Sequence, residues 1–107
     1  MTRILYLDDD PQVRCAIADV LREAGYAVVE VGDTDGVMRE LGKGAFDLVL
    51  LDYVIPGARG DQIACRIEAA WPGTPVALMT GYAEFLSLTG KGEGRLVISK
   101  PLSYDDL

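Results

Sequence analysis

Three aspartates, a threonine and a lysine stand out in the sequence because together they suit the chemistry of a phosphoryl group. Asp8, Asp9 and Asp52 offer only oxygen ligands, which suit Mg²⁺ or Mn²⁺ and do not suit zinc or copper. A carboxylate can also attack phosphorus, while the Thr80 hydroxyl can donate to a phosphoryl oxygen and Lys100 can balance its charge. The alternative for the carboxylates is a set of solvated side chains at loop edges, and the lysine favours the metal site over it.

Asp10 has a different expected role, because Pro11 follows it. Aspartate at the N-cap with proline at the first helical position is typical of the start of a helix. Asp8 and Asp9 lie too early to cap that helix, and adjacent carboxylates repel each other unless a cation or a lysine is near. We therefore predict that Asp10 caps a helix while the other two belong to the site.

The elements that must position these side chains alternate along the chain. Short apolar runs typical of strands span 4–7, 27–31, 48–51, 76–79 and 96–98. Between the first four runs, apolar residues at helical spacing predict helices at 13–24, 33–41 and 63–71. This alternation predicts a doubly wound α/β sandwich, with a five-stranded parallel sheet between layers of helices. Ligands of such sheets bind at the carboxyl ends of the strands, where four of the five predicted strands place a charged or hydroxyl side chain.

Glycine, proline and aspartate mark the ends of these elements. Gly25 is predicted to end the first helix, Asp33 to cap the second, and Gly42 with Gly44 to end it. The glycines and the proline at 56–60 predict a loop between the third strand and the third helix.

The composition is that of an ordinary globular domain, and it excludes several kinds of site. The 107 residues include 10 Lys or Arg and 17 Asp or Glu, a net charge of −7, which disfavours binding to nucleic acid or to a membrane surface. The absence of histidine excludes His-ligated zinc, Ser-His-Asp or Cys-His catalysis and a phosphohistidine donor. Cys15 and Cys65 are too few for a disulfide framework. Neither a signal peptide nor a membrane span is found, so we expect a cytoplasmic location.

Four motifs follow one another at the ends of four predicted strands. They are ILYLDDDP at 4–11, LDYVIPGARG at 51–60, MTGYA at 79–83 and SKPL at 99–102. Together they make the chain resemble the receiver domain of two-component response regulators. The match runs through the entire chain at the spacing of that family, which makes it specific where one motif alone would be weak. The resemblance implies a flavodoxin-like receiver fold and a single domain over 1–107.

The resemblance also implies a Mg²⁺ (or Mn²⁺) site. Asp9 would bind the ion directly, Asp8 would act mainly through a metal-bound water, and Asp52 would be a further ligand. Val54, two residues after Asp52, would supply its backbone carbonyl, so its side chain is not constrained.

The same resemblance implies how a phosphoryl group arrives, is held and is lost. Asp52 would be the phosphoacceptor, and a sensor histidine kinase or a histidine phosphotransfer protein would be the donor. Thr80 would be the switch hydroxyl, and Lys100 would pair with the phosphoryl group. In the family, the side chains at Val54 and Tyr82 flank the path of the hydrolytic water. Neither can orient water, so slow hydrolysis is expected.

Three features depart from the usual pattern of the family. Val97 stands where an aromatic residue often couples to the switch threonine, and Tyr82 is the candidate to replace it. Glycines within 90–94 shorten the predicted fourth helix, as in receivers attached to hybrid sensor kinases. That helix and the fifth strand form the common dimer face, so a homodimer stays open. The chain ends at Leu107, where a fifth helix should begin, which indicates that this helix is trimmed.

Two other functions also stay open at this point. A haloacid-dehalogenase-like Mg²⁺ phosphatase would use an Asp-x-Asp motif, which Asp8 and Asp10 could supply. Against it, Asp10 fits a helix cap, and 107 residues leave no room for a cap domain. A phosphorylation-independent pseudo-receiver that only binds proteins would not need the acceptor, the metal ligands, the hydroxyl and the lysine together. We therefore expect a switch that catalyses its own phosphorylation and dephosphorylation and is not a turnover enzyme.

Overall fold

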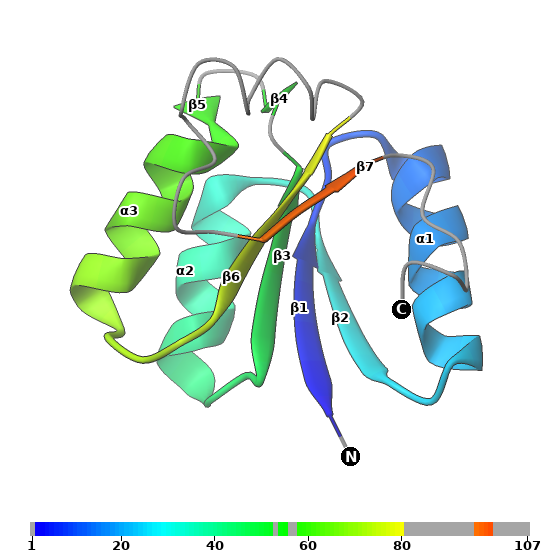
Figure 1. Ribbon diagram of the computed structural model, residues 1–107, viewed down its shortest axis with the longest axis horizontal. Helices are drawn as coiled ribbons and strands as arrows, with labels where there is room; N and C mark the ends of the chain where they lie inside the picture. Colours follow the sequence, from blue (N-terminus) through cyan, green and yellow to red (C-terminus); the bar gives the residue numbers. More distant parts are fainter. Residues whose placement is uncertain (1, 53, 56–57, 81–95, 100–107) are drawn as a thin grey trace.

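The main feature of the fold is one parallel sheet of five strands (Figure 1). The computed structural model describes residues 2–52, 54–55, 58–80 and 96–99. The strands are β1 (Arg3–Leu7), β2 (Ala27–Val31), β3 (Leu48–Asp52), β6 (Val76–Thr80) and β7 (Leu96–Ser99). Their order is β2-β1-β3-β6-β7, so the chain first moves outward from β1 and then returns to its other side. This order confirms the doubly wound sheet that the sequence predicts.

Helices cover both faces of this sheet. Helix α1 (Pro11–Glu23) lies on one face, and α2 (Thr34–Lys43) and α3 (Gly60–Ala70) lie on the other (Figure 1). Alternate residues of each central strand therefore enter different apolar clusters, as the two-residue period of a strand requires. The cluster under α1 contains Tyr6 and Met79 from the sheet, together with other buried residues: Ile4, Ile17, Ala18, Leu21, Leu50 and Ala77.

Helix ends follow the local signals in the sequence, with one exception. The Asp10 carboxylate accepts hydrogen bonds from two backbone N–H groups in the first turn of α1, and the Asp33 carboxylate caps α2 by accepting one from the Gly36 N–H. Gly25 follows α1 with a φ of 101°, in the left-handed region that glycine adopts at little cost. Gly42 lies inside α2 and does not end it, because the helix continues to Lys43 and Gly44 is its C-cap, as predicted for Gly44. The helix propensity of the neighbouring residues is high enough to offset the low propensity of one glycine.

The connection between β3 and α3 differs from the loop that we predict at 56–60. Two short strands, β4 (Val54–Ile55) and β5 (Ala58–Arg59), pair there as an antiparallel hairpin. The glycines and the proline of this segment indicate a turn, but strands of two residues are too short to show a periodic pattern. The hairpin directly follows the end of β3, so it lies beside the edge of the sheet where we expect the site.

Other predictions fall outside the described residues. They include the shortened fourth helix within 82–95, the trimmed fifth helix, and the lysine at position 100.

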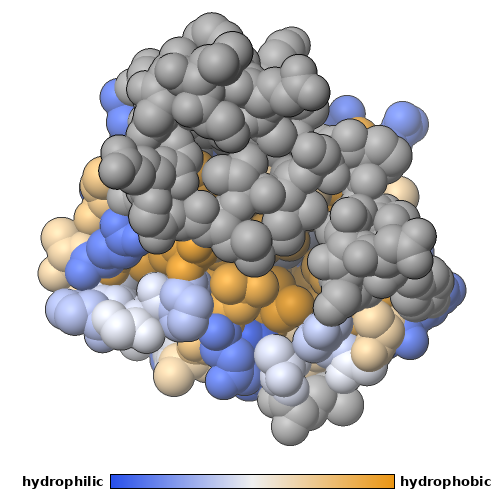
Figure 2. All heavy atoms as spheres, in the orientation of Figure 1, coloured by the Kyte–Doolittle hydropathy of each residue, from blue (hydrophilic) through white to orange (hydrophobic). Residues whose placement is uncertain are grey.

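Figure 2 shows apolar residues gathered in the middle of one face of the molecule, with hydrophilic residues along its margin. No helix in the described part of the chain is both long enough and apolar enough to cross a membrane.

Candidate functional site

The register of the sheet brings the expected site residues to one edge. Leu7 of β1 pairs with Leu51 of β3, so Asp8, which directly follows β1, and Asp52, which ends β3, lie at the same level of the sheet edge. Asp52 in turn pairs with Met79 of β6, which places Thr80 one residue further along the neighbouring strand. The carboxyl ends of three adjacent strands therefore meet as predicted.

Asp8, Asp9 and Asp52 form a carboxylate cluster at this edge. One carboxylate oxygen from each residue lies within 4.8 Å of the other two. Asp8 is completely buried and Asp52 is 7% exposed, whereas Asp9 is exposed. The alternative of solvated carboxylates at loop edges is therefore wrong for two of the three residues. Burying like charges this close together is costly unless a cation or a donor offsets their repulsion.

Asp8 is held by hydrogen bonds on both its side chain and its backbone. Its Oδ1 accepts from the backbone N–H of Asp10 at 3.1 Å, and its Oδ2 accepts from the Tyr6 hydroxyl at 2.8 Å. Its backbone carbonyl accepts from Nη1 of Arg14 on α1 at 2.9 Å, and its backbone N–H donates to the Val31 carbonyl at 3.2 Å. These four contacts fix the position of Asp8 before any ligand arrives.

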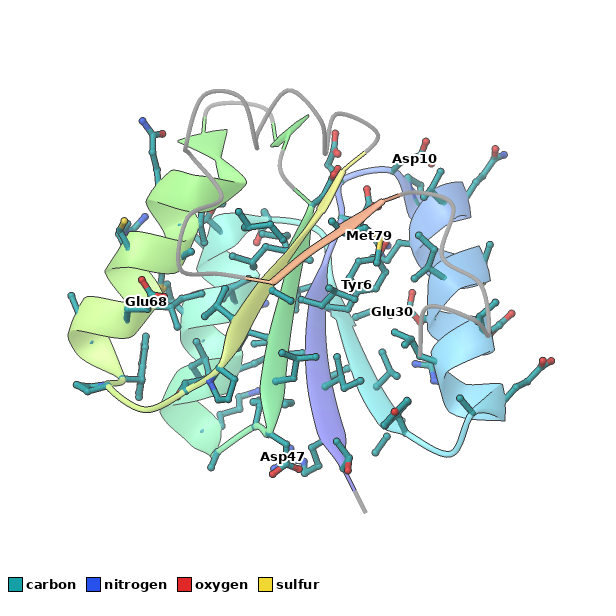
Figure 3. The ribbon with its side chains drawn as sticks, viewed as in Figure 1. Tyr6, Asp10, Glu30, Asp47, Glu68 and Met79 are labelled. Carbon is teal, nitrogen blue, oxygen red and sulfur yellow. The ribbon has the colours of Figure 1, made fainter. Side chains whose placement is uncertain are left out.

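Tyr6 is a residue of the site that the sequence did not single out. Its ring lies in the layer between the sheet and α1, close to Met79 (Figure 3). Burial raises the pKa of its phenol, and the hydrogen bond to Asp8 and the negative charges of Asp8 and Asp52 raise it further. The phenol therefore stays protonated and acts as a donor. Its position two residues before Asp8 was the available signal, because residues i and i+2 of a strand share a face.

The donor set of the cluster fits a hard divalent cation. All three residues offer carboxylate oxygens, which Mg²⁺, Mn²⁺ and Ca²⁺ prefer to nitrogen or sulfur. Two of the carboxylates are buried and fixed by the strands, while exposed Asp9 leaves one side open to solvent. Such an arrangement can hold a cation and still admit a small anionic ligand to Asp52.

The remaining expected site residues are only partly placed. Thr80 is the last residue of β6 and pairs with Ser99 of β7, so Lys100 comes directly after a residue that pairs with Thr80. Lys100 itself lies outside the described residues. Val54 begins β4, two residues after Asp52. Asp10 caps α1, so its carboxylate is not free to complete the Asp-x-Asp motif of a phosphatase.

Comparisons with known proteins agree with this geometry. Residues 4–107 match the response regulator receiver domain family. The transcriptional regulatory protein TcrA of Mycobacterium tuberculosis is 29% identical over 98% of the chain, which spans 42% of TcrA. The chain thus spans less than half the length of this relative.

Solved structures show the same fold over nearly the whole chain. The response regulator TrrA of Thermotoga maritima in complex with Mg²⁺-BeF has a TM-score of 0.86 and 27% identity, covering 98% of this chain and 91% of TrrA. TrrA has also been solved in complex with the histidine kinase ThkA. That structure has the same TM-score and identity, and the match covers 99% of this chain and 91% of the matched chain.

Proposed function

Because the chain belongs to the response regulator receiver domain family, we propose that it is a signalling switch controlled by phosphorylation of Asp52. The observation that carries the proposal is the carboxylate cluster, in which Asp52 ends β3 beside the fixed, buried Asp8 and the exposed Asp9. Asp52 combines a strand-end position with a small exposed area, so a phosphoryl group can reach it while bulk water is limited.

In the proposed reaction a carboxylate oxygen of Asp52 forms a bond to phosphorus. The bond from phosphorus to the partner's imidazole nitrogen breaks, and its electron pair stays on that nitrogen, which then takes up a proton. Water later attacks phosphorus and releases inorganic phosphate, which restores the carboxylate. These 107 residues contain no histidine, so the phosphohistidine must lie outside them.

We propose that Asp9, Asp52 and the Val54 carbonyl hold Mg²⁺, with Asp8 acting through a bound water. When bound, the ion would screen the negative charge between the carboxylates and an incoming phosphoryl group. The complete burial of Asp8 and its four protein contacts support a role in fixing the site, and the exposure of Asp9 supports direct access to the ion.

Thr80 and Lys100 are proposed to bind the phosphoryl oxygens. Thr80 ends the strand beside Asp52, and Lys100 follows Ser99, the register partner of Thr80, in the sequence, which supports this proposal. A hydroxyl donor and a cation that bind the phosphoryl oxygens would stabilise their charge and change the surface near the ends of these strands.

The proposed partner is a sensor histidine kinase or a histidine phosphotransfer protein. The solved complex of TrrA with the histidine kinase ThkA supports this class of partner. Both cysteines, Cys15 and Cys65, are exposed thiols, which fits the reducing cytoplasm in which we propose that the chain acts. The net charge of −7 argues against nucleic acid as a direct ligand of this chain.

Beryllium fluoride tests the proposal, because it mimics a phosphoryl group on an aspartate. With Mg²⁺ present, we expect it to shift amide signals of residues near Asp52, Asp9 and Thr80 in NMR spectra, and EDTA should reverse the change. Asp52→Asn should abolish the response, whereas Asp19→Asn, an exposed change on α1, should leave it intact. No Mg²⁺-dependent response in the unmodified chain would instead favour the pseudo-receiver.

A further inference from the structure

Two of the three carboxylates in the cluster, those of Asp8 and Asp9, differ in how far the protein holds them in place. Both side-chain oxygens of Asp8 accept hydrogen bonds from the protein, and the residue has no solvent-exposed area. Asp9 is exposed, and its carboxylate makes no hydrogen bond to any residue in the described ranges. A cation that approaches the cluster therefore meets one ligand whose orientation is already set and one that must still be ordered.

The orientation of Asp8 depends on a side chain from inside the core. Tyr6 is completely buried in the apolar cluster under α1, and its hydroxyl lies 2.8 Å from Oδ2 of Asp8. A second hydrogen bond to this carboxylate, from the Asp10 N–H, is longer at 3.1 Å and comes from the loop just before α1. Packing fixes the ring, so the hydroxyl is a rigid donor and Oδ2 has one preferred position.

We propose that Tyr6 is a positioning residue for the divalent-cation site and acts through Asp8. Its hydroxyl fixes the Asp8 carboxylate and takes up part of its negative charge, which lowers the repulsion from Asp52 and Asp9. This inference rests on the proposed function, because it assumes that the cluster binds a cation. Loss of a partner that orients a metal-binding side chain typically lowers metal affinity by about 10- to 100-fold.

Removal of the hydroxyl alone isolates this role, because Tyr6→Phe keeps the ring that fills the core. Tyr26→Phe is the matched control: Tyr26 packs against the same apolar cluster, but it precedes β2 at the opposite end of the sheet. The measurement is the free Mn²⁺ signal in electron paramagnetic resonance during titration of the metal-free chain. Circular dichroism verifies that each variant is folded at the temperature used.

We expect Tyr6→Phe to weaken Mn²⁺ binding by about tenfold, the lower end of the effect of losing such a partner, and Tyr26→Phe to bind like the wild type. A double-mutant cycle with Asp8→Asn separates positioning from a general loss of stability. If Tyr6 acts through Asp8, adding Tyr6→Phe to Asp8→Asn should cause no further loss of affinity.

Equal Mn²⁺ affinity of Tyr6→Phe and the wild type would overturn the inference and leave the proposed function standing. The inference would also be overturned if Tyr6→Phe lowered Mn²⁺ affinity equally in the wild type and in the Asp8→Asn variant, because the tyrosine would then not act through Asp8. If the wild type itself binds no Mn²⁺, the proposed function fails and the inference falls with it.

Discussion

Asp8 and Asp52 leave two neighbouring strands at the same level, because the residues before them, Leu7 and Leu51, are register partners in the sheet. Both carboxylates are buried, and Asp9 brings a third carboxylate within 4.8 Å. Two hydrogen bonds to the carboxylate oxygens of Asp8 partly offset its negative charge. The folded chain therefore stores electrostatic repulsion at the edge where a phosphoryl group would bind, and a cation would relieve it.

The first prediction concerns stability and Mg²⁺. A cation that binds only the folded state stabilises it, by about 1.4 kcal/mol when its concentration is ten times the Kd. For a domain of this size we expect a rise in Tm of roughly 5–10 °C. Without metal, Asp52→Asn should also raise Tm, because it removes one of the repelling charges. Differential scanning calorimetry with and without EDTA measures both effects.

Asp19→Asn is the control for that experiment, since it removes an exposed charge from α1, away from the cluster. It should leave the response to Mg²⁺ unchanged. If neither Mg²⁺ nor Asp52→Asn alters the melting curve, the three carboxylates do not share a site.

The second prediction concerns the support of Asp8 from α1. A Cβ at Gly32 would lie 3.0 Å from Nη1 of Arg14, the atom that donates to the Asp8 carbonyl. Gly32→Ala should displace the guanidinium and weaken this bond, with a loss of about 1 kcal/mol in the free energy of unfolding. Gly42→Ala is the control, because a Cβ there meets open space inside α2 and should stabilise the helix by about 0.5–1 kcal/mol. Urea denaturation of both variants distinguishes the two effects, and equal stabilisation would contradict the role of Arg14.

The third prediction concerns alkaline pH. The pKa of the Tyr6 phenol is raised above the ordinary value of 10.0 in the folded chain, chiefly by burial. The stability that this protonated phenol contributes is complete below pH 10 and is lost as the pH rises further, because the unfolded chain then releases the proton first. The stability of the wild type relative to Tyr6→Phe should therefore fall by about 1.4 kcal/mol per pH unit above that point.

Urea midpoints measured from about pH 8 to about pH 11 test this, with Tyr26→Phe as a second reference. Parallel pH profiles for the wild type and Tyr6→Phe would show that the Tyr6 phenol ionises as easily in the folded chain as in the unfolded one.

The parallel, doubly wound sheet could be predicted from the sequence because short apolar runs alternate with helical patterns, whereas the order of the strands was not predicted. The pairing of Asp10 with Pro11 likewise located the start of α1. Asp8, Asp9 and Asp52 could be grouped because parallel strands end at one edge. The contact of Tyr6 with Asp8 was missed, because the pattern predicts only that a tyrosine inside an apolar run is buried in the core. The position of its hydroxyl is known only from the structure. The β4–β5 hairpin was missed because two residues per strand carry no period.

The fourth prediction concerns how long the phosphoryl group survives, and it rests on the sequence alone. Val54 and Tyr82 cannot orient a water toward phosphorus as a carboxylate or an amide can, and both take up volume. The double variant Val54→Asn and Tyr82→Glu should therefore lose phosphate faster than the wild type once the donor is removed. Decay at the same rate or more slowly would show that these two residues do not protect the phosphoryl group.

The most direct test of the account is the intact mass of the chain after incubation with acetyl phosphate and Mg²⁺. We expect the mass of one phosphoryl group to be added, with peptide mapping locating it at Asp52, and no addition when EDTA replaces Mg²⁺. Asp52→Asn should abolish the addition, while Asp19→Asn should not affect it. Unchanged phosphate incorporation in Asp52→Asn would contradict the central claim, that the carboxylate at the end of β3 is the phosphoacceptor.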